Sequence, residues 1–137
     1  MRVLVIPEDP TYNGYILKPL IERLMESVGK SKAKIVVLTD PSAQGYEMIK
    51  AELPNIYERY RQFFDLMLFL PDLDCKDRAD ALANVETQAQ QAGVKLLACA
   101  AVQEVEAWLL AGHINKLKDR WQTVRDACDL KELYFDP

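Results

Sequence analysis

The sequence predicts an α/β fold with a mostly parallel sheet, on three observations. Four short apolar runs lack the alternation of apolar and polar residues that marks a strand with one face in water. Stretches with the 3.6-residue period of an amphipathic helix lie between them. The resulting order is β-α-β-α-β-α-β-α, which is typical of a parallel sheet covered on both faces. The expected strands are residues 3–6, 35–38, 66–70 and 94–99.

Length and composition indicate one globular domain. The chain has 137 residues, of which 50% are hydrophobic and 28% are charged, as in a folded protein with one hydrophobic core. We expect the core over residues 1–112 and a helical extension over residues 113–137. No apolar run approaches the ~20 residues of a membrane span, and the N-terminal run is too short for a signal peptide. The sequence therefore predicts a single cytoplasmic domain with no membrane partner.

Charge and cysteine content limit the function classes. The net charge of −4 is unlike the basic footprint of a typical nucleic-acid-binding domain. Cys75, Cys99 and Cys128 are odd in number and share no zinc-type spacing. We therefore expect neither a disulfide framework nor a Cys-rich metal site.

The helices are placed by periodic apolar residues and by prolines and glycines. The first is expected to begin near residues 13–16, so that Pro19 falls in or near its first turn, where the missing N–H costs little. Pro54 divides the second stretch into two short helices, 46–53 and 56–63, or breaks a single one. Gly93 fits the C-cap of a third helix. The remaining helices are expected over residues 79–89, 102–112 and 116–126.

Acidic residues follow three of the four expected strands at their carboxyl ends, where ligands bind in open parallel sheets. Converging carboxylates repel one another, and their pKa values rise unless a cation compensates. Oxygen ligands without His or Cys suit Mg²⁺ or Mn²⁺. The sequence therefore predicts a metal site at this edge of the sheet. Its candidate acids are Glu8, Asp9, Asp72, Asp74, Glu104 and Glu106.

Two of these acids also have a purely structural explanation. Asp9 precedes a proline, which is the arrangement of an N-cap before the first helical position. Asp74 fits equally well as the cap of a helix that starts near Lys76. Neither explanation applies to Glu8 or Asp72.

Glu106 is the most informative of the acids. On a helix over 102–112, at 100° per residue, Glu106 falls inside the apolar stripe. A carboxylate is rarely buried unless it is paired or binds a metal. Glu106 is thus a metal ligand, the partner of an Arg or Lys, or a residue at a partly exposed edge of the stripe. Glu104 points to the opposite side, and we expect it in solvent. The stripe consists of Val102, Val105, Trp108, Leu109 and Leu110.

The segments that carry these acids resemble Toprim domains, the catalytic domain of topoisomerases, primases and old-family nucleases. Such domains have a glutamate after the first strand and Asp-x-Asp after a later, very apolar strand, and the matching stretches here are "VLVIPED" and "LMLFLPDLD". The stretches "VQEVEAWLLAG" and "IPEDPTYNGYILKPLIERL" are similar to segments of a bacterial Toprim-like family of largely unassigned role, which carries "REVEAWLLAD". The resemblance covers most of residues 1–112. It implies a Rossmann-like, three-layer fold with a four-stranded sheet flanked by helices.

The resemblance implies a metal-dependent nuclease. Glu8 matches the glutamate that binds metal and serves in proton transfer, and Asp72 and Asp74 match the metal-binding pair. Glu106, with Glu104 as second choice, matches the further acid of nuclease members. The implied cofactor is Mg²⁺ or Mn²⁺, and the implied substrate is DNA or RNA. Nuclease relatives often act beside an ATPase in phage defence, which implies an ATPase partner, and a homo-oligomer is left open.

The chain departs from the nuclease pattern in three places. Relatives have a lysine for the developing phosphate charge, a second acid one turn after the glutamate, and an arginine before the last acids. For the lysine, Lys116 and Lys118 are candidates that no motif distinguishes. Tyr12 stands in place of the second acid, and Gln103 in place of the arginine. A catalytically inactive Toprim-like module that binds a partner protein or nucleotide is therefore an alternative.

A receiver-like phosphoacceptor domain is a further alternative. Glu8 and Asp9 would hold Mg²⁺, and Asp72 would take the phosphoryl group. This function needs a hydroxyl residue after the fourth strand and a lysine after a fifth. The fourth expected strand is followed by "AAVQ" instead, and the sequence shows no fifth strand before Lys116.

Overall fold

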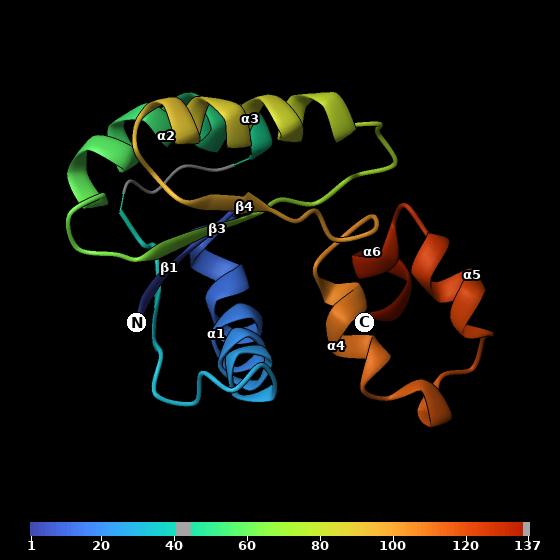
Figure 1. Ribbon diagram of the computed structural model, residues 1–137. Coiled ribbons are helices and arrows are strands. Elements are labelled where there is room, and N and C mark those ends of the chain that lie inside the picture. Colours follow the sequence, from blue (N-terminus) through green and yellow to red (C-terminus); the bar gives the residue numbers. More distant parts are fainter. Residues whose placement is uncertain (41–44, 136–137) are drawn as a thin grey trace.

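The computed structural model describes residues 1–40 and 45–135; the side chains of residues 10–13, that of Tyr12 included, lie outside the description. Strands and helices alternate along the first hundred residues, and short helices follow (Figure 1). The strands are β1 (Arg2–Pro7), β2 (Lys34–Val37), β3 (Leu66–Leu70) and β4 (Leu96–Ala98). The helices are α1 (Pro10–Ser27), α2 (Tyr46–Tyr60), α3 (Ala79–Gln91), α4 (Glu106–Ala111), the 3₁₀ turn η1 (Ile114–Lys116), α5 (Trp121–Asp126) and α6 (Leu130–Tyr134).

The four strands form one parallel sheet in the order β2-β1-β3-β4, which confirms the predicted α/β fold. Helix α1 lies on one face, and α2 and α3 lie on the other (Figure 1). Every residue of β3, and of β1 after Arg2, is buried. This double coverage explains why both strands are continuous apolar runs rather than alternating ones.

Side chains on alternate positions of the central strands build two separate cores. Leu4, Ile6 and Phe69 point toward α2 and α3, and all three are at most 1% exposed. Val5 and Leu68 point the other way and pack with α1. The two-residue period of a strand thus divides each apolar run between the two layers.

Two helices accommodate prolines that the sequence suggested would limit them. Helix α1 begins at Pro10, so Pro19 lies well inside it, and the prediction of a first-turn proline is wrong. Burial of Leu17 and Ile21 on the sheet offsets the lost hydrogen bond. Helix α2 is continuous across Pro54, because buried side chains on either side hold it to the core.

The C-terminal residues form a small helical cluster beside the sheet (Figure 1). A single helix over 116–126 is not present, because α5 begins only at Trp121 after the η1 turn. A disulfide joins Cys75 to Cys128, with 5.6 Å between their Cα atoms, within the usual range. The sequence predicted no disulfide framework and did not indicate this single bond, because only the fold brings together cysteines 53 residues apart. Across residues 1–40 and 45–135, no helix is long and apolar enough to cross a bilayer.

Candidate functional site

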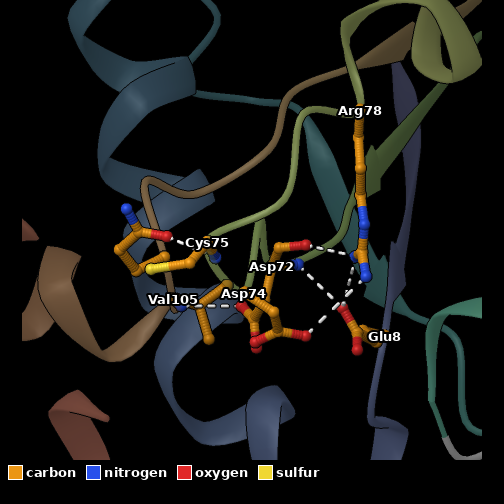
Figure 2. A network of polar contacts seen from close by, with 7 residues as sticks. Glu8, Asp72, Asp74, Cys75, Arg78 and Val105 are labelled. Carbon is orange, nitrogen blue, oxygen red and sulfur yellow. Dashed lines mark hydrogen bonds and ion pairs between the residues drawn. The ribbon is translucent and has the colours of Figure 1, made fainter. Parts of the chain in front are cut away.

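Glu8 and Asp72 leave neighbouring strands at the point where the strand order reverses. β1 and β3 pair along their length, with Pro7 opposite Leu70. The connection from β1 passes through α1 to one edge of the sheet, whereas β3 leads to the other edge. Such a switch point, beyond the carboxyl ends of the strands, is the usual ligand site of an open α/β sheet. Here the N–H of Asp72 donates to Oε2 of Glu8 at 2.8 Å (Figure 2).

The loop after β3 is fastened to the segment after β4. Asp72 forms a parallel bridge with Ala101, and the N–H of Asp74 donates to the carbonyl of Gln103 at 3.0 Å. The Cys75 N–H donates to Oε1 of Gln103 at 2.6 Å. Asp74 and Cys75 have φ of 50° and 56°, a left-handed conformation that Asp tolerates better than most residues. Gln103 thus positions the Asp-x-Asp loop.

Asp72 is a buried carboxylate in an acidic surrounding. It is 7% exposed, and its Oδ1 accepts the N–H of Val105 at 2.8 Å. Figure 2 shows it between Val105 and Glu8. Burial raises the pKa of Asp72 to about 7, and the negative charges of Glu8, Glu106 and Asp74 add to the rise. Near neutral pH this carboxylate is therefore poised between its protonated and ionised forms.

Glu106 is buried as predicted, but the expected helix over residues 102–112 does not form in full. It is 6% exposed, and α4 begins at Glu106 rather than at Val102. The residues before it pair with the β3 loop instead of forming a helical turn, and Val102 among them is 40% exposed. Leu109, which the predicted stripe also included, lies within α4 and is 42% exposed. Oε1 of Glu106 lies 3.1 Å from Nζ of Lys131. Its Oε2 is buried without a hydrogen-bond partner.

Lys131 is a functional candidate that the sequence did not reveal. Its backbone N–H donates to Oε2 of Glu104 at 2.9 Å, and its Nζ pairs with Glu106. Burial disfavours the charge of Lys131, but the hydrogen bond and the charge of Glu106 outweigh this and raise its pKa. Glu104 is half-buried rather than free in solvent, and burial raises its pKa. The predicted candidates Lys116 and Lys118 are both exposed.

Arg78 is a second functional candidate that the sequence did not reveal. It is 8% exposed, and its guanidinium lies 3.7 Å from the centroid of the Tyr46 ring, a cation–π contact. Nη1 donates to the carbonyl of Asp72 at 2.5 Å. Nη1 lies 3.9 Å from Oε2 of Glu8, and Nη2 lies 3.9 Å from Oδ2 of Asp74. Burial raises the pKa of Glu8, and the charge of Arg78 opposes that rise.

The helix-capping roles predicted for Asp9 and Asp74 have different outcomes. Helix α3 begins at Ala79, so the prediction that Asp74 caps a helix from Lys76 is wrong. Asp77 is closer to that role, because its Oδ1 accepts the N–H of Ala79 at 3.1 Å. Asp9 does lie directly before α1, where an N-cap would be.

The acids suit a divalent cation in their chemistry, but they do not enclose one as they stand. Glu106 offers a buried oxygen without a partner, and Asp72 carries a pKa of about 7 that a cation would lower. Within the described part of the chain, however, no three acidic, His or Cys side chains are placed to hold a metal ion together. Arg78 and Lys131 stand beside the acids instead. A metal ion at this site would have to replace part of the positive charge that Arg78 and Lys131 now supply.

Comparisons with known proteins add no relative. No family model, curated protein or solved structure matches this chain. The role of the site is therefore inferred from its own side chains.

Proposed function

We propose that the chain is a metal-dependent phosphodiesterase of the Toprim type that acts on DNA or RNA. The observation that carries this proposal is Asp72, a carboxylate at the switch point of a parallel sheet. Burial raises its pKa to about 7, and the nearby charges of Glu8, Glu106 and Asp74 add to the rise. Carboxylates so arranged repel one another, and a cation between them would relieve this repulsion.

Each acid has a place in the proposed mechanism. Asp72, Asp74 and Glu106 would hold Mg²⁺ or Mn²⁺, with Glu104 as a further ligand. In such a site the ion supplies charge neutralisation at the phosphate and a bound water of lowered pKa. Glu8, whose pKa burial raises, can carry a proton between water and the leaving oxygen.

The two cations near the acids favour a phosphate ligand. Arg78 is fixed between the Tyr46 ring and the carbonyl of Asp72, so it supplies a preorganised positive charge. Lys131 is 46% exposed at its side chain and can turn toward a phosphate oxygen. The net charge of −4 remains unfavourable for nucleic acid. An ATPase partner, which the Toprim resemblance implies, would have to supply the missing basic surface.

A catalytically inactive Toprim-like module is the second candidate. The favouring observation is that Arg78 lies near Glu8 and Asp74 while Lys131 pairs with Glu106, so the acids have counter-charges without metal. A receiver-like function has less support. The strand order β2-β1-β3-β4 matches the first four strands of receivers, but Asp72 is buried and its Oδ1 is occupied by the Val105 N–H.

The test is cleavage of supercoiled DNA, single-stranded DNA and RNA with Mg²⁺ or Mn²⁺, beside calorimetric titration with Mn²⁺. Asp72→Asn keeps the shape and the Val105 hydrogen bond but removes the charge. We expect it to lose metal binding and cleavage, while the exposed control Asp80→Asn on α3 retains both. Cleavage at the wild-type rate by Asp72→Asn would refute the proposal. Mn²⁺ binding without cleavage of any substrate would favour the inactive module.

A further inference from the structure

The C-terminal cluster places a lysine where a cation is needed. Lys131 contacts two of the candidate ligands, Glu104 through its backbone N–H and Glu106 through Nζ. The ammonium group thus neutralises the most buried end of the acidic site. Metal binding to Glu106 competes with this ion pair.

The cluster that carries Lys131 is weakly held by burial alone. Its described core has three fully buried side chains, those of Ala107, Val124 and Leu130. The hydrophobic residues packed against them are only partly buried: Leu110, Leu117, Trp121, Ala127 and Tyr134. Helices α5 and α6 have six and five residues, well below the length at which an isolated helix is stable in water. Its position therefore depends on additional attachments.

The disulfide is such an attachment, and it ends inside the acidic loop. Cys75 directly follows Asp74, and Cys128 lies between α5 and α6, three residues before Lys131. One covalent bond therefore ties the Asp-x-Asp loop to the segment whose Lys131 pairs with Oε1 of Glu106. Both cysteines are exposed, so a reductant can reach the bond.

We propose that the Cys75–Cys128 disulfide is a redox latch that keeps Lys131 on the acidic site, and that its reduction opens this site to a divalent cation. The inference rests on the proposed function and names its regulation. In a reducing compartment such as the one the sequence predicts, disulfides are mostly transient or redox-sensing.

The reducing partner is a dithiol. One of its thiolates attacks one sulfur of the bond, forms a mixed disulfide and releases the other cysteine, which takes a proton. The second thiol of the reductant then closes its own disulfide and releases the first cysteine. Two electrons and two protons pass to Cys75 and Cys128, and the reductant leaves as a disulfide.

The experiment is Mn²⁺ titration of the full chain by calorimetry, oxidised and after treatment with dithiothreitol that is then removed. Alkylation and mass spectrometry establish the state of the cysteines. We expect reduction to tighten Mn²⁺ binding about two- to fivefold, the effect of removing about 0.5–1 kcal/mol of competing interaction. Cys128→Ser should reproduce this gain, whereas Cys99→Ser, at the free and exposed cysteine, should leave the redox response intact.

Lys131→Gln separates the latch from a general loosening of the chain. The oxidised variant should already bind Mn²⁺ as tightly as the reduced wild type, and reduction should add nothing. Amide hydrogen exchange over residues 130–134 of the wild type, measured without metal, should accelerate on reduction.

The outcomes keep the two proposals apart. Equal Mn²⁺ affinity of the oxidised and reduced wild type, or unchanged exchange over residues 130–134, overturns the latch and leaves the proposed function standing. Absence of Mn²⁺ binding in every form, reduced Lys131→Gln included, overturns the proposed function and the latch with it.

Discussion

The sheet and the C-terminal cluster are stabilised in different ways. The sheet has two cores in which β1 and β3 are buried on both faces. The cluster has a small core and depends on a disulfide and on the contacts of Lys131. Burial of apolar surface is the larger and less specific force. The cluster, in contrast, combines a small apolar core with a few bonds that can be made or broken singly.

The acidic site lies where these two regions meet. Glu8 and Asp72 are fixed by the sheet, while Glu104 and Glu106 belong to the segment that leads into the cluster. Regions with few buried contacts open at lower free energy than the core. The geometry of the site can therefore change through the cluster while the sheet stays folded.

The strongest test of this difference is loss of a core side chain. Phe69 on β3 is 0% exposed, so Phe69→Ala should lower the free energy of unfolding by about 3–5 kcal/mol. Urea denaturation followed by circular dichroism measures the loss. Phe63→Ala is the control, because Phe63 is 56% exposed and its removal should change stability by less than about 0.5 kcal/mol. Similar losses in both variants would contradict the described core.

The matching change in the cluster should act locally. Leu130 is 0% exposed in the small third core, and Leu130→Ala should cost about 2–3 kcal/mol, at the low end for a buried leucine. Hydrogen exchange should accelerate over residues 106–134 and stay slow in β1 and β3. Leu133→Ala, at a 58% exposed position on the same helix, is the control. Equal acceleration in the sheet would show that the two regions unfold together.

The same difference explains what the sequence could predict. β3 coincides with its predicted bounds, and β1 and β2 differ from theirs by one or two residues. Continuous apolar runs are local features, and each needs only burial to become a strand. Glu8 and Asp72 were found for a related reason, because both directly follow such runs.

The rest of the site depends on contacts between distant residues. Arg78 lies in a polar stretch and Lys131 lies among apolar residues near the C-terminal end, and neither stretch marks them as partners of the acids. Only the fold brings them to the acids. The disulfide has the same cause. The helix expected from residue 102 starts late, because the Val105 N–H donates to Asp72 and the Gln103 carbonyl accepts from Asp74. No periodicity in the segment itself reveals these partners.

The pH dependence of stability probes the sheet side of the site. In the folded chain the pKa of Asp72 is about 7, above its ordinary value of 3.8. The folded state therefore keeps a proton that the unfolded chain loses, and stability falls as pH rises from about 4 to about 7.

Asp72→Asn should remove most of this fall and stabilise the metal-free chain at pH 8 by on the order of 2 kcal/mol. Thermal unfolding of both proteins from pH 4 to pH 8 measures it, with Asp80→Asn as the control. A wild-type slope that persists in Asp72→Asn would assign the pH dependence to another group.

The ion pair between Glu106 and Lys131 should give the smallest effect, and the most specific one. Glu106 is nearly buried but Lys131 is half-exposed, so solvent screens the pair, and a coupling free energy of about 0.5–1 kcal/mol is expected. A double-mutant cycle with Glu106→Gln and Lys131→Gln measures it in the oxidised chain, and the coupling should weaken in 1 M salt. The same cycle with Glu132→Gln in place of Glu106→Gln should give no coupling, because Glu132 is an exposed neighbour on α6. If the coupling survives reduction of the disulfide at full strength, Lys131 keeps its place without the bond. The cluster would then be held by its own packing, as the sheet is, and not by the disulfide.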